Sequence, residues 1–464
     1  MNFKILLRLL PLALVCLSSL HALQLSNRTG STIEVEILAI EAERIQIQMS
    51  NGQITWLQRE RLSDDSQALI ASQATEEREV YLTINSLLGI DLFADSQLWD
   101  DSVDHVAERL HWPQESETAY QTSYRYYPPS EYRILDTRPY SAVLYGHSGK
   151  PQRISIVFAN KGDFPFSDPP STNEIATMEQ AIEQDVEHLQ ALLSQQFGEP
   201  ERQQYGAGRG IKQLIERWDW KGHAFLLAAQ DGEYTNLKII PTDLADNKGR
   251  GDKLSDASLR QLTTENIVHV PNGDVFINNI PMVNQGPKGY CVPATFERYL
   301  RYMQIPADMY ILAMAGQTAI GGGTSLSQTI ESIDGYVSSH NRSMKKINRE
   351  IKLRTVQKYI DRGLPIIWTM FSSRDYNEFV NERSIQRLQT SHWDEWKTRC
   401  KDESRKVELR KDFLSAHACM IIGYNKETEE VAVSDSWGPN YALRWVPVDQ
   451  AEQVSQGSIY LIEF

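Results

Sequence analysis

Apolar and polar residues alternate in three short runs near the N-terminus of the chain. Residues 33–37 (Ile-Glu-Val-Glu-Ile) and 45–49 (Ile-Gln-Ile-Gln-Met) each place their apolar side chains on one face, and residues 54–57 form a third run. This period of two predicts half-buried strands, and Asn51-Gly52 predicts a tight turn between two of them. Residues 62–65 (Leu-Ser-Asp-Asp) predict the start of a short helix. We therefore expect a small β unit over residues 23–75.

A second pattern covers residues 76–250. Residues 100–112 and 174–197 carry apolar side chains at helical spacing, and Gly198-Glu199-Pro200 ends the second helix. Apolar runs at 142–145, 154–158, 224–228 and 237–240 predict strands between turns. We expect a separate α+β domain whose role the sequence does not reveal, followed by a linker over residues 241–261. Trp218, Trp220 and His223 are expected to pack rather than to form a binding cage.

The first 22 residues have the pattern of a signal peptide. Lys4 and Arg8 flank the start of an apolar stretch that Pro11 interrupts, and the stretch ends in small residues before a plausible cut after Ala22. The stretch is short for a membrane-spanning helix, which needs about 20 apolar residues. Cys16 is a poor lipidation site because the residue before it is Val15. We expect a secreted or periplasmic protein that is not inserted in the membrane after signal cleavage.

The charge of the chain excludes some partners. Its 47 basic and 61 acidic residues give −14, and removing Lys4 and Arg8 leaves 45 against 61, or −16. An acidic surface repels nucleic acid and anionic lipid, so neither is expected as a partner.

Three cysteines remain after signal cleavage: Cys291, Cys400 and Cys419. An odd number in an exported protein leaves at least one thiol unpaired. Cys400 and Cys419 could form a disulfide; alternatively Cys419 is a small buried apolar residue. The disulfide would leave Cys291 free.

Residues 283–294 (Val-Asn-Gln-Gly-Pro-Lys-Gly-Tyr-Cys-Val-Pro-Ala) hold the first part of a candidate active site. Phe296, Tyr299, Leu300 and Met303 follow at helical spacing, which places Cys291 at a helix N-terminus. The helix dipole and free N–H groups there favour a thiolate. Gln285, six residues upstream, is suited to stabilising an oxyanion beside the Cys291 amide.

A candidate base and its orienting partner occur downstream. His417 begins an apolar strand, and residues 431–434 form a second buried strand that ends at Asp435. A hairpin around residues 425–428 would place the two strands side by side, so Asp435 could orient His417 and His417 could exchange a proton with Cys291. His340 and His392 are weaker candidates because neither precedes an apolar strand. Asn440 competes with Asp435 but is expected to lie in a turn.

These motifs resemble the papain-like cysteine peptidases. Gln-Gly-x-x-Gly-x-Cys ends at Cys291, His417 follows 126 residues later, and residues 434–438 (Ser-Asp-Ser-Trp-Gly) are similar to the family's Asn-Ser-Trp-Gly, whose Trp shields the His–Asn pair. The use of Asp is typical of the bacteriocin-leader-processing branch. The resemblance covers residues 262–464 and implies a helix that bears Cys, packed on an antiparallel sheet, with no metal and no cofactor.

The sequence departs from papain in three ways. Val292 replaces an aromatic residue, Asp435 replaces Asn, and residues 372–413 form a long, charged and helical insertion. The first two departures are compatible with the Asp-using branch. The insertion could cover the site or stand clear of it.

Residues 24–72 resemble a small Src-homology-3-like barrel of the actin-adaptor homology type. This resemblance implies a module that positions the protein or binds a protein partner; the alternative is a β-rich cap without a ligand.

The sequence therefore predicts a three-domain α+β protein that hydrolyses peptide bonds in a peptide or protein substrate through Cys291, His417, Asp435 and Gln285. The alternatives are a non-catalytic peptide-binding relative and a cell-wall amidohydrolase. The latter class usually sets its Cys in an Asp-Cys-Ser/Ala-Gly context, which is absent here. Whether the N-terminal 240 residues inhibit the site stays open.

Overall fold

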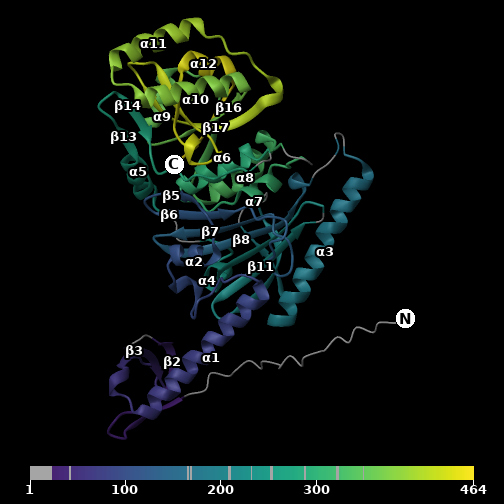
Figure 1. Ribbon diagram of the computed structural model, residues 1–464, viewed down its shortest axis with the longest axis vertical. Coiled ribbons are helices and arrows are strands. Elements are labelled where there is room, and N and C mark those ends of the chain that lie inside the picture. Colours follow the sequence, from purple (N-terminus) through teal and green to yellow (C-terminus); the bar gives the residue numbers. More distant parts are fainter. Residues whose placement is uncertain are drawn as a thin grey trace. The chain divides into compact units, whose positions relative to one another are not determined.

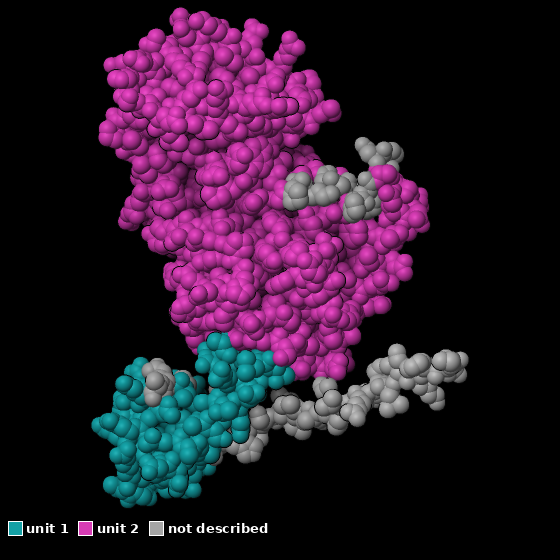
Figure 2. Space-filling model, in the orientation of Figure 1, with its two compact units in different colours: residues 1–84, 94–96 teal, residues 85–93, 97–464 magenta. Residues whose placement is uncertain are grey.

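The computed structural model describes residues 23–40, 43–164, 167, 170–206, 211–230, 232–250, 254–286, 289–319, 323–348 and 350–464. The expected signal peptide, residues 1–22 with Cys16, lies outside the described residues. The chain divides into two compact units, the first formed by residues 1–84 and 94–96 and the second by residues 85–93 and 97–464 (Figures 1 and 2). The middle and C-terminal regions share the second unit.

The first unit contains the three strands that the alternation predicts, with one further strand before them. Its described residues form a four-stranded antiparallel sheet in the order β1-β2-β3-β4. Gly52 has a φ of +82° in the turn after β3, which is the conformation that Asn-Gly favours. Closure of this sheet into a barrel stays a prediction. The elements are β1 (Leu23–Ser26), β2 (Thr32–Ile40), β3 (Arg44–Met49), β4 (Ile54–Gln58) and α1 (Asp64–Leu88).

Leu25, Val35, Ile45 and Ile47 form the core of this unit together with Leu62 and Ile70. Leu62 precedes α1 and Ile70 lies within it, so the helix closes the apolar face of the sheet. The expectation of a short helix is wrong, since α1 has 25 residues.

The middle region of the second unit is built on an antiparallel sheet. Its described strands follow the order β5-β6-β7-β8-β12-β11-β10-β9. The strands are β5 (Gln114–Glu117), β6 (Gln121–Tyr126), β7 (Ser141–His147), β8 (Lys150–Asn160), β9 (Glu201–Tyr205), β10 (Gln213–Trp220), β11 (His223–Gln230) and β12 (Tyr234–Pro241). The four runs predicted as strands are confirmed as β7, β8, β11 and β12.

Both predicted helices of the middle region are confirmed as α2 (Val103–Leu110) and α3 (Thr172–Phe197). Ser171 caps α3 through a reciprocal capping box with Glu174. His223 is fully buried and accepts a hydrogen bond from the backbone N–H of Leu98 at 3.1 Å, so it packs as expected. The segment expected to be a linker contains α4 (Thr242–Asp246) and the start of α5 (Asp256–Glu265), so that expectation is wrong for these parts.

The C-terminal region is built on a second antiparallel sheet. In the described chain its order is β13-β14-β17-β16-β20-β15, and β18 pairs with both β17 and β19. These strands are β13 (Ile267–His269), β14 (Asp274–Ile277), β15 (Ser343–Ile347), β16 (Ile366–Phe371), β17 (Ala416–Asn425), β18 (Glu430–Ser434), β19 (Arg444–Pro447) and β20 (Ser455–Glu463).

The helices of this region are α6 (Cys291–Tyr302), α7 (Met309–Ala315), α8 (Leu326–Ser339), α9 (Leu353–Ile360), α10 (Arg374–Gln389), α11 (Trp393–Lys406) and α12 (Val448–Val454). The insertion over residues 372–413 is helical, as predicted. The mixture of helices and antiparallel sheets is compatible with the predicted α+β class.

Helix α6 lies between the two sheets (Figure 1). Its apolar side chains Phe296, Tyr299 and Leu300 belong to the core of the C-terminal region, and Thr295 donates a hydrogen bond to the Ala418 carbonyl of β17 at 3.1 Å. Its buried Glu297 faces the middle sheet, where the Tyr145 hydroxyl of β7 donates to it at 2.9 Å. The burial of one apolar face was predicted; burial of the polar face was not.

A substitution at Gly423 of β17 tests how closely β14 packs against this strand in the C-terminal sheet. A Cβ at Gly423 would lie 2.6 Å from the Cβ of Phe276 and from the carbonyl oxygen of Val275. Because β14 cannot move away without losing its pairing, Gly423→Ala should lower the free energy of unfolding by about 1–3 kcal/mol. Thermal or urea unfolding measures this.

Gly335→Ala is the matched control. Gly335 lies inside α8, and no atom lies within 4 Å of the position that an alanine Cβ would take there. Alanine should therefore stabilise the protein by roughly 0.5–1 kcal/mol. A Gly423→Ala protein as stable as the wild type would contradict the described packing.

Candidate active site

Cys291 is the first residue of α6, as the sequence predicts. Tyr290 precedes it as the N-cap residue and makes no side-chain capping bond. The positive end of the helix dipole and the amides of the first turn therefore face the half-buried thiol, and both stabilise a negative charge on the sulfur.

His417 and Asp435 are brought together by the β17–β18 hairpin. Ser434 pairs with Met420, so the residue after Ser434 lies opposite Cys419, and His417 is the next residue on the same face of β17. The two side chains meet through Nε2 of His417 and Oδ1 of Asp435 at 2.9 Å. Both are buried, with 8% of His417 and 1% of Asp435 exposed.

Cys291 and His417 are hydrogen-bonded, and each affects the titration of the other. Burial raises the pKa of the Cys291 thiol, but the hydrogen bond and charge of His417, with the backbone amides of Ala418 and Val292, bring it below its ordinary value. Burial lowers the pKa of His417, whereas its hydrogen bonds to Asp435 and Cys291 raise it to about 9. Both shifts favour the form in which Cys291 is a thiolate and His417 an imidazolium.

Asp435 is kept ionised by Arg444. Burial raises the pKa of the Asp435 carboxyl, but the Arg444 guanidinium and His417 bring it below its ordinary value. Arg444 donates to Oδ2 of Asp435 at 2.5 Å and to Oδ1 of Asn381 at 2.7 Å. Asn381 lies in α10, so the inserted segment supports the site from the side of Asp435.

Trp437 covers the His417 ring. The two rings stack with their centroids 4.7 Å apart and an angle of 28° between their planes. This is the shielding role that the resemblance to Ser-Trp-Gly implies, since an apolar ring excludes water from a hydrogen bond and strengthens it.

Arg298 joins α6 to the strand end that carries Asp435. Its guanidinium donates to the Ser434 side chain at 2.6 Å and to the Pro281 carbonyl at 2.9 Å. Burial lowers its pKa to about 10. One helix therefore carries Cys291 and also fixes the segment that leads to Asp435.

Gln285 lies beside the site through its backbone. Its N–H donates to the Ser436 carbonyl at 2.9 Å, next to Asp435. Gly286 follows with a φ of +71°, a conformation that favours glycine, and so redirects the chain toward Cys291. The structure thus gathers all four predicted residues in one region; the oxyanion role of Gln285 stays a prediction.

The competing residues lie elsewhere. His340 follows α8 and its Nδ1 is 3.0 Å from the Tyr336 carbonyl oxygen, and His392 precedes α11. Asn440 is exposed in a short turn, as expected.

Cys400 and Cys419 are free and buried, so the disulfide considered above is absent. Cys400 instead lies 2.9 Å from a guanidinium nitrogen of Arg383, and Cys419 is a core residue of β17. Cys419 is therefore the small buried apolar residue that was the alternative.

The described residues contain no group of three His, Cys, Asp or Glu side chains placed to hold a metal ion. Among the same residues, no helix is both long and apolar enough to cross a membrane.

Sequence reasoning missed Arg298 and Arg444. Arg298 stands near Glu297 and Arg301 in a run that is typical of the solvent-facing side of an amphipathic helix. Arg444 follows a turn that no motif marks. A cluster of three charges on a helix next to a candidate nucleophile is the one signal that could have indicated a buried polar interface.

A cysteine at a helix N-terminus, next to a buried histidine that is hydrogen-bonded to a carboxylate, is the arrangement typical of papain-like cysteine peptidases. Residues 277–459 match the family model of the Peptidase_C39 like family, which supports this class for the C-terminal region. No curated protein matches the chain.

The pH dependence of Cys291 reactivity tests the coupled pair. Alkylation by iodoacetamide follows the thiolate, so the rate should reach its half-maximum below the pH expected of an ordinary cysteine. In Asp435→Asn the imidazolium loses its carboxylate and the pKa of His417 falls, which removes positive charge from the thiolate and moves the midpoint to higher pH. Both midpoints are measured by quenching the alkylation at timed intervals over a range of pH and quantifying the modified Cys291 peptide by mass spectrometry.

Asn440→Ala is the control, because Asn440 is exposed and was the competing orienter. It should leave the alkylation midpoint unchanged. Equal midpoints in the wild type and Asp435→Asn would show that Asp435 does not act on the pair.

Proposed function

We propose that the chain is a cysteine peptidase that hydrolyses peptide bonds through an acyl-thioester on Cys291. The hydrogen-bonded set of Cys291, His417 and Asp435 is the observation that carries this proposal, and the match to a peptidase family agrees with it. The substrate is a peptide or protein, and the domain that acts on it is residues 262–464.

The reaction uses the charges that the folded site already holds. The Cys291 thiolate attacks the scissile carbonyl carbon, and the Cys291 amide with Gln285 stabilises the oxyanion. The His417 imidazolium donates its proton to the leaving amine as the C–N bond breaks. His417, now neutral, takes a proton from water, the resulting hydroxide attacks the thioester, and the acid product leaves as the thiolate and imidazolium form again.

The electrostatics favour catalysis over simple binding. A buried ion costs several kcal/mol unless it is paired and hydrogen-bonded. Here the structure buries an arginine, a carboxylate and an imidazole in one chain of contacts, from Arg444 through Asp435 to His417. A cleft that only held a peptide would gain nothing from keeping the imidazole charged beside a thiol.

Cys291→Ala tests the proposal directly. It should reduce turnover of any cleaved substrate by at least about 10³-fold, because the covalent step is lost. Proteomic identification of peptides released from a protein mixture, compared between wild type and variant, measures this.

Cys400→Ala is the matched control, since Cys400 is buried beside Arg383 and takes no part in the reaction. It should retain turnover. Peptide binding that survives Cys291→Ala, with no cleavage by the wild type, would favour the non-catalytic alternative. Release of fragments from purified peptidoglycan would favour the amidohydrolase.

We also propose that the protein is exported and that its signal peptide is cut after Ala22. The strand β1 begins at Leu23, so this cut leaves the first unit of the fold intact. N-terminal sequencing of the mature protein should find Leu23 first. A mature chain that still starts at Met1 would contradict export by this route.

A further inference from the structure

The segment that leads into the nucleophile is held by side chains of the middle region. We call residues 282–290 the nucleophile loop; residues 287 and 288 lie outside the described part of the chain. The loop contains Gln285 and ends at Tyr290, immediately before Cys291. Its position determines where an oxyanion formed on Cys291 would meet its donors.

Both backbone polar groups of Asn284 are bound by the middle region. The Asn284 N–H donates to Oε1 of Glu115 at 2.8 Å, and the Tyr127 hydroxyl donates to the Asn284 carbonyl at 2.8 Å. Two residues earlier, the Met282 N–H donates to the Ser116 hydroxyl at 2.9 Å. Side chains of β5 and of the residue after β6 therefore hold the loop, and both backbone groups of the residue before Gln285 are occupied.

The next residue is fixed from the opposite side. The Gln285 N–H donates to the Ser436 carbonyl of the C-terminal region at 2.9 Å. Gln285 is thus held between the middle sheet, through Asn284, and the strand end that carries Asp435. Movement of either support changes the direction of the Gln285 side chain.

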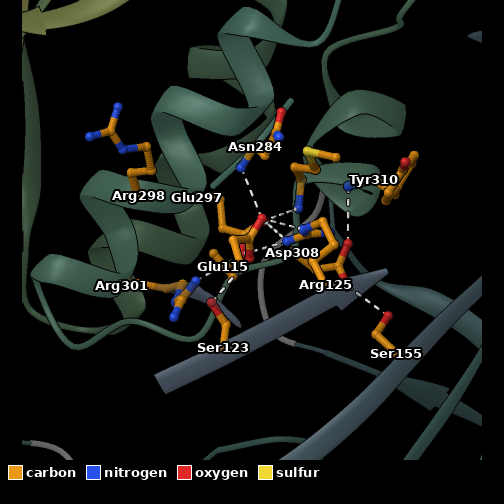
Figure 3. Close-up of polar contacts among 12 residues, drawn as sticks. Glu115, Ser123, Arg125, Ser155, Asn284, Glu297, Arg298, Arg301, Asp308 and Tyr310 are labelled. Atoms are coloured by element: carbon orange, nitrogen blue, oxygen red, sulfur yellow. Dashed lines mark hydrogen bonds and ion pairs between the residues drawn. The ribbon is translucent and has the colours of Figure 1, made fainter. Parts of the chain in front are cut away.

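Glu115 is itself rigidly held. Its side chain is 3% exposed and accepts hydrogen bonds from Nε of Arg125 at 2.6 Å and from the Ser123 hydroxyl at 3.0 Å. Figure 3 shows Glu115 and Arg125 together below α6, with Asn284 joined to the carboxylate. An anchor with these partners can adopt few other rotamers, so it transmits the position of the sheet to the loop.

The same network reaches α6. Arg125 lies 3.4 Å from the carboxylate of Glu297 (Figure 3). This carboxylate also accepts hydrogen bonds from the Tyr145 hydroxyl at 2.9 Å and the Met309 N–H at 2.8 Å. Glu297 is fully buried, which raises its pKa, and Arg125 and Arg301 oppose that rise. Removing the middle sheet would leave this buried carboxylate without half of its partners.

Tyr290 forms a third attachment. Its hydroxyl lies 2.8 Å from Oδ1 of Asp163 and 3.0 Å from Oδ1 of Asn160, both in the middle region. Gly162 makes room for it, since a Cβ there would lie 2.3 Å from the Tyr290 oxygen. The residue directly before the nucleophile is therefore anchored in the middle region as well.

We propose that the middle region is a permanent part of the peptidase rather than a removable inhibitory segment, and that Glu115 and Tyr127 are positioning residues for the oxyanion side of the active site. This inference rests on the proposed function, because it takes from that proposal the role of Gln285 in stabilising the oxyanion. Glu115 and Tyr127 act through Asn284 and do not touch the substrate.

Tyr127→Phe is the sharpest test, because it removes one hydrogen bond to the loop and keeps the ring that packs against Gly286. Two reactions of Cys291 are compared in the full-length protein. Acylation by p-nitrophenyl acetate passes through an oxyanion as the thiolate displaces nitrophenolate. Alkylation by iodoacetamide displaces iodide from carbon and forms no oxyanion, so it depends on the thiolate alone.

The ratio of the acylation rate to the alkylation rate should fall about tenfold in Tyr127→Phe, since misplacement of a positioned group by about 1 Å can cost 10²-fold. The alkylation rate itself should be unchanged. Gln285→Ala should lower the same ratio without changing alkylation.

Tyr124→Phe is the matched control. Tyr124 lies on β6 and donates its hydroxyl to Asp104 of α2 at 2.5 Å, on the other face of the sheet. This variant should keep the wild-type ratio. An unchanged ratio in Tyr127→Phe, or an equal fall in Tyr124→Phe, overturns the positioning role. A wild type that is acylated but cuts no peptide overturns the proposed function and leaves the positioning inference standing.

Discussion

The contact between the Cys291 thiol and the His417 imidazole is the interaction on which the rest of the structure depends. Cys291 is at the start of a helix and His417 is near the start of a strand, so the two side chains meet only when α6 packs on β17. Asp435 then favours the protonated form of the imidazole, and Arg444 keeps the Asp435 carboxylate ionised. Cys291, His417, Asp435 and Arg444 thus form one row of side chains, each in contact with the next, and the fold supplies the contacts that hold this row in place.

The supports of this row come from three separate parts of the chain. The inserted helix α10 holds Arg444 through Asn381, Arg298 of α6 holds the end of β18, and the middle sheet holds the nucleophile loop through Glu115 and Tyr127. Buried polar networks of this kind contribute little net stability, because desolvation of each group offsets most of its Coulomb energy. These networks instead favour one defined geometry, since each donor in them has few other acceptors within reach.

Much of the local structure could be predicted from the sequence. Alternation and helical spacing located β2, β3 and β4 of the first unit, four strands of the middle sheet, α2, α3 and the start of α6, because these patterns depend on burial that neighbouring residues share. The joint pattern of Gln285, Cys291, His417 and Asp435 predicted a candidate site whose members the structure brings close together, because each residue lies beside an element that the same patterns predict. The length of α1 was predicted wrongly, although Gly89 follows the helix with a φ of +74°, the conformation typical of a glycine at a helix C-terminus.

The sequence could not show which face of α6 meets the middle sheet. Glu297, Arg298 and Arg301 have the pattern of solvent-exposed residues, and only the tertiary structure brings Arg125, Tyr145 and Ser434 to them. The same holds for Cys400 and Cys419. Whether they form a disulfide depends on the distance between α11 and β17, which the sequence does not show. No periodic pattern in the sequence indicates which distant residues a polar side chain contacts, so these partners could be identified only from the structure.

The pKa of His417 is the measurement that tests this account most directly. An NMR titration of the imidazole, assigned by comparison with His417→Gln, should give a value of about 9 in the wild type. The value should fall in Cys291→Ala, where the negative charge of the thiolate is missing. A wild-type value at or below that of an ordinary histidine, unchanged in Cys291→Ala, would show that the two groups do not share a proton.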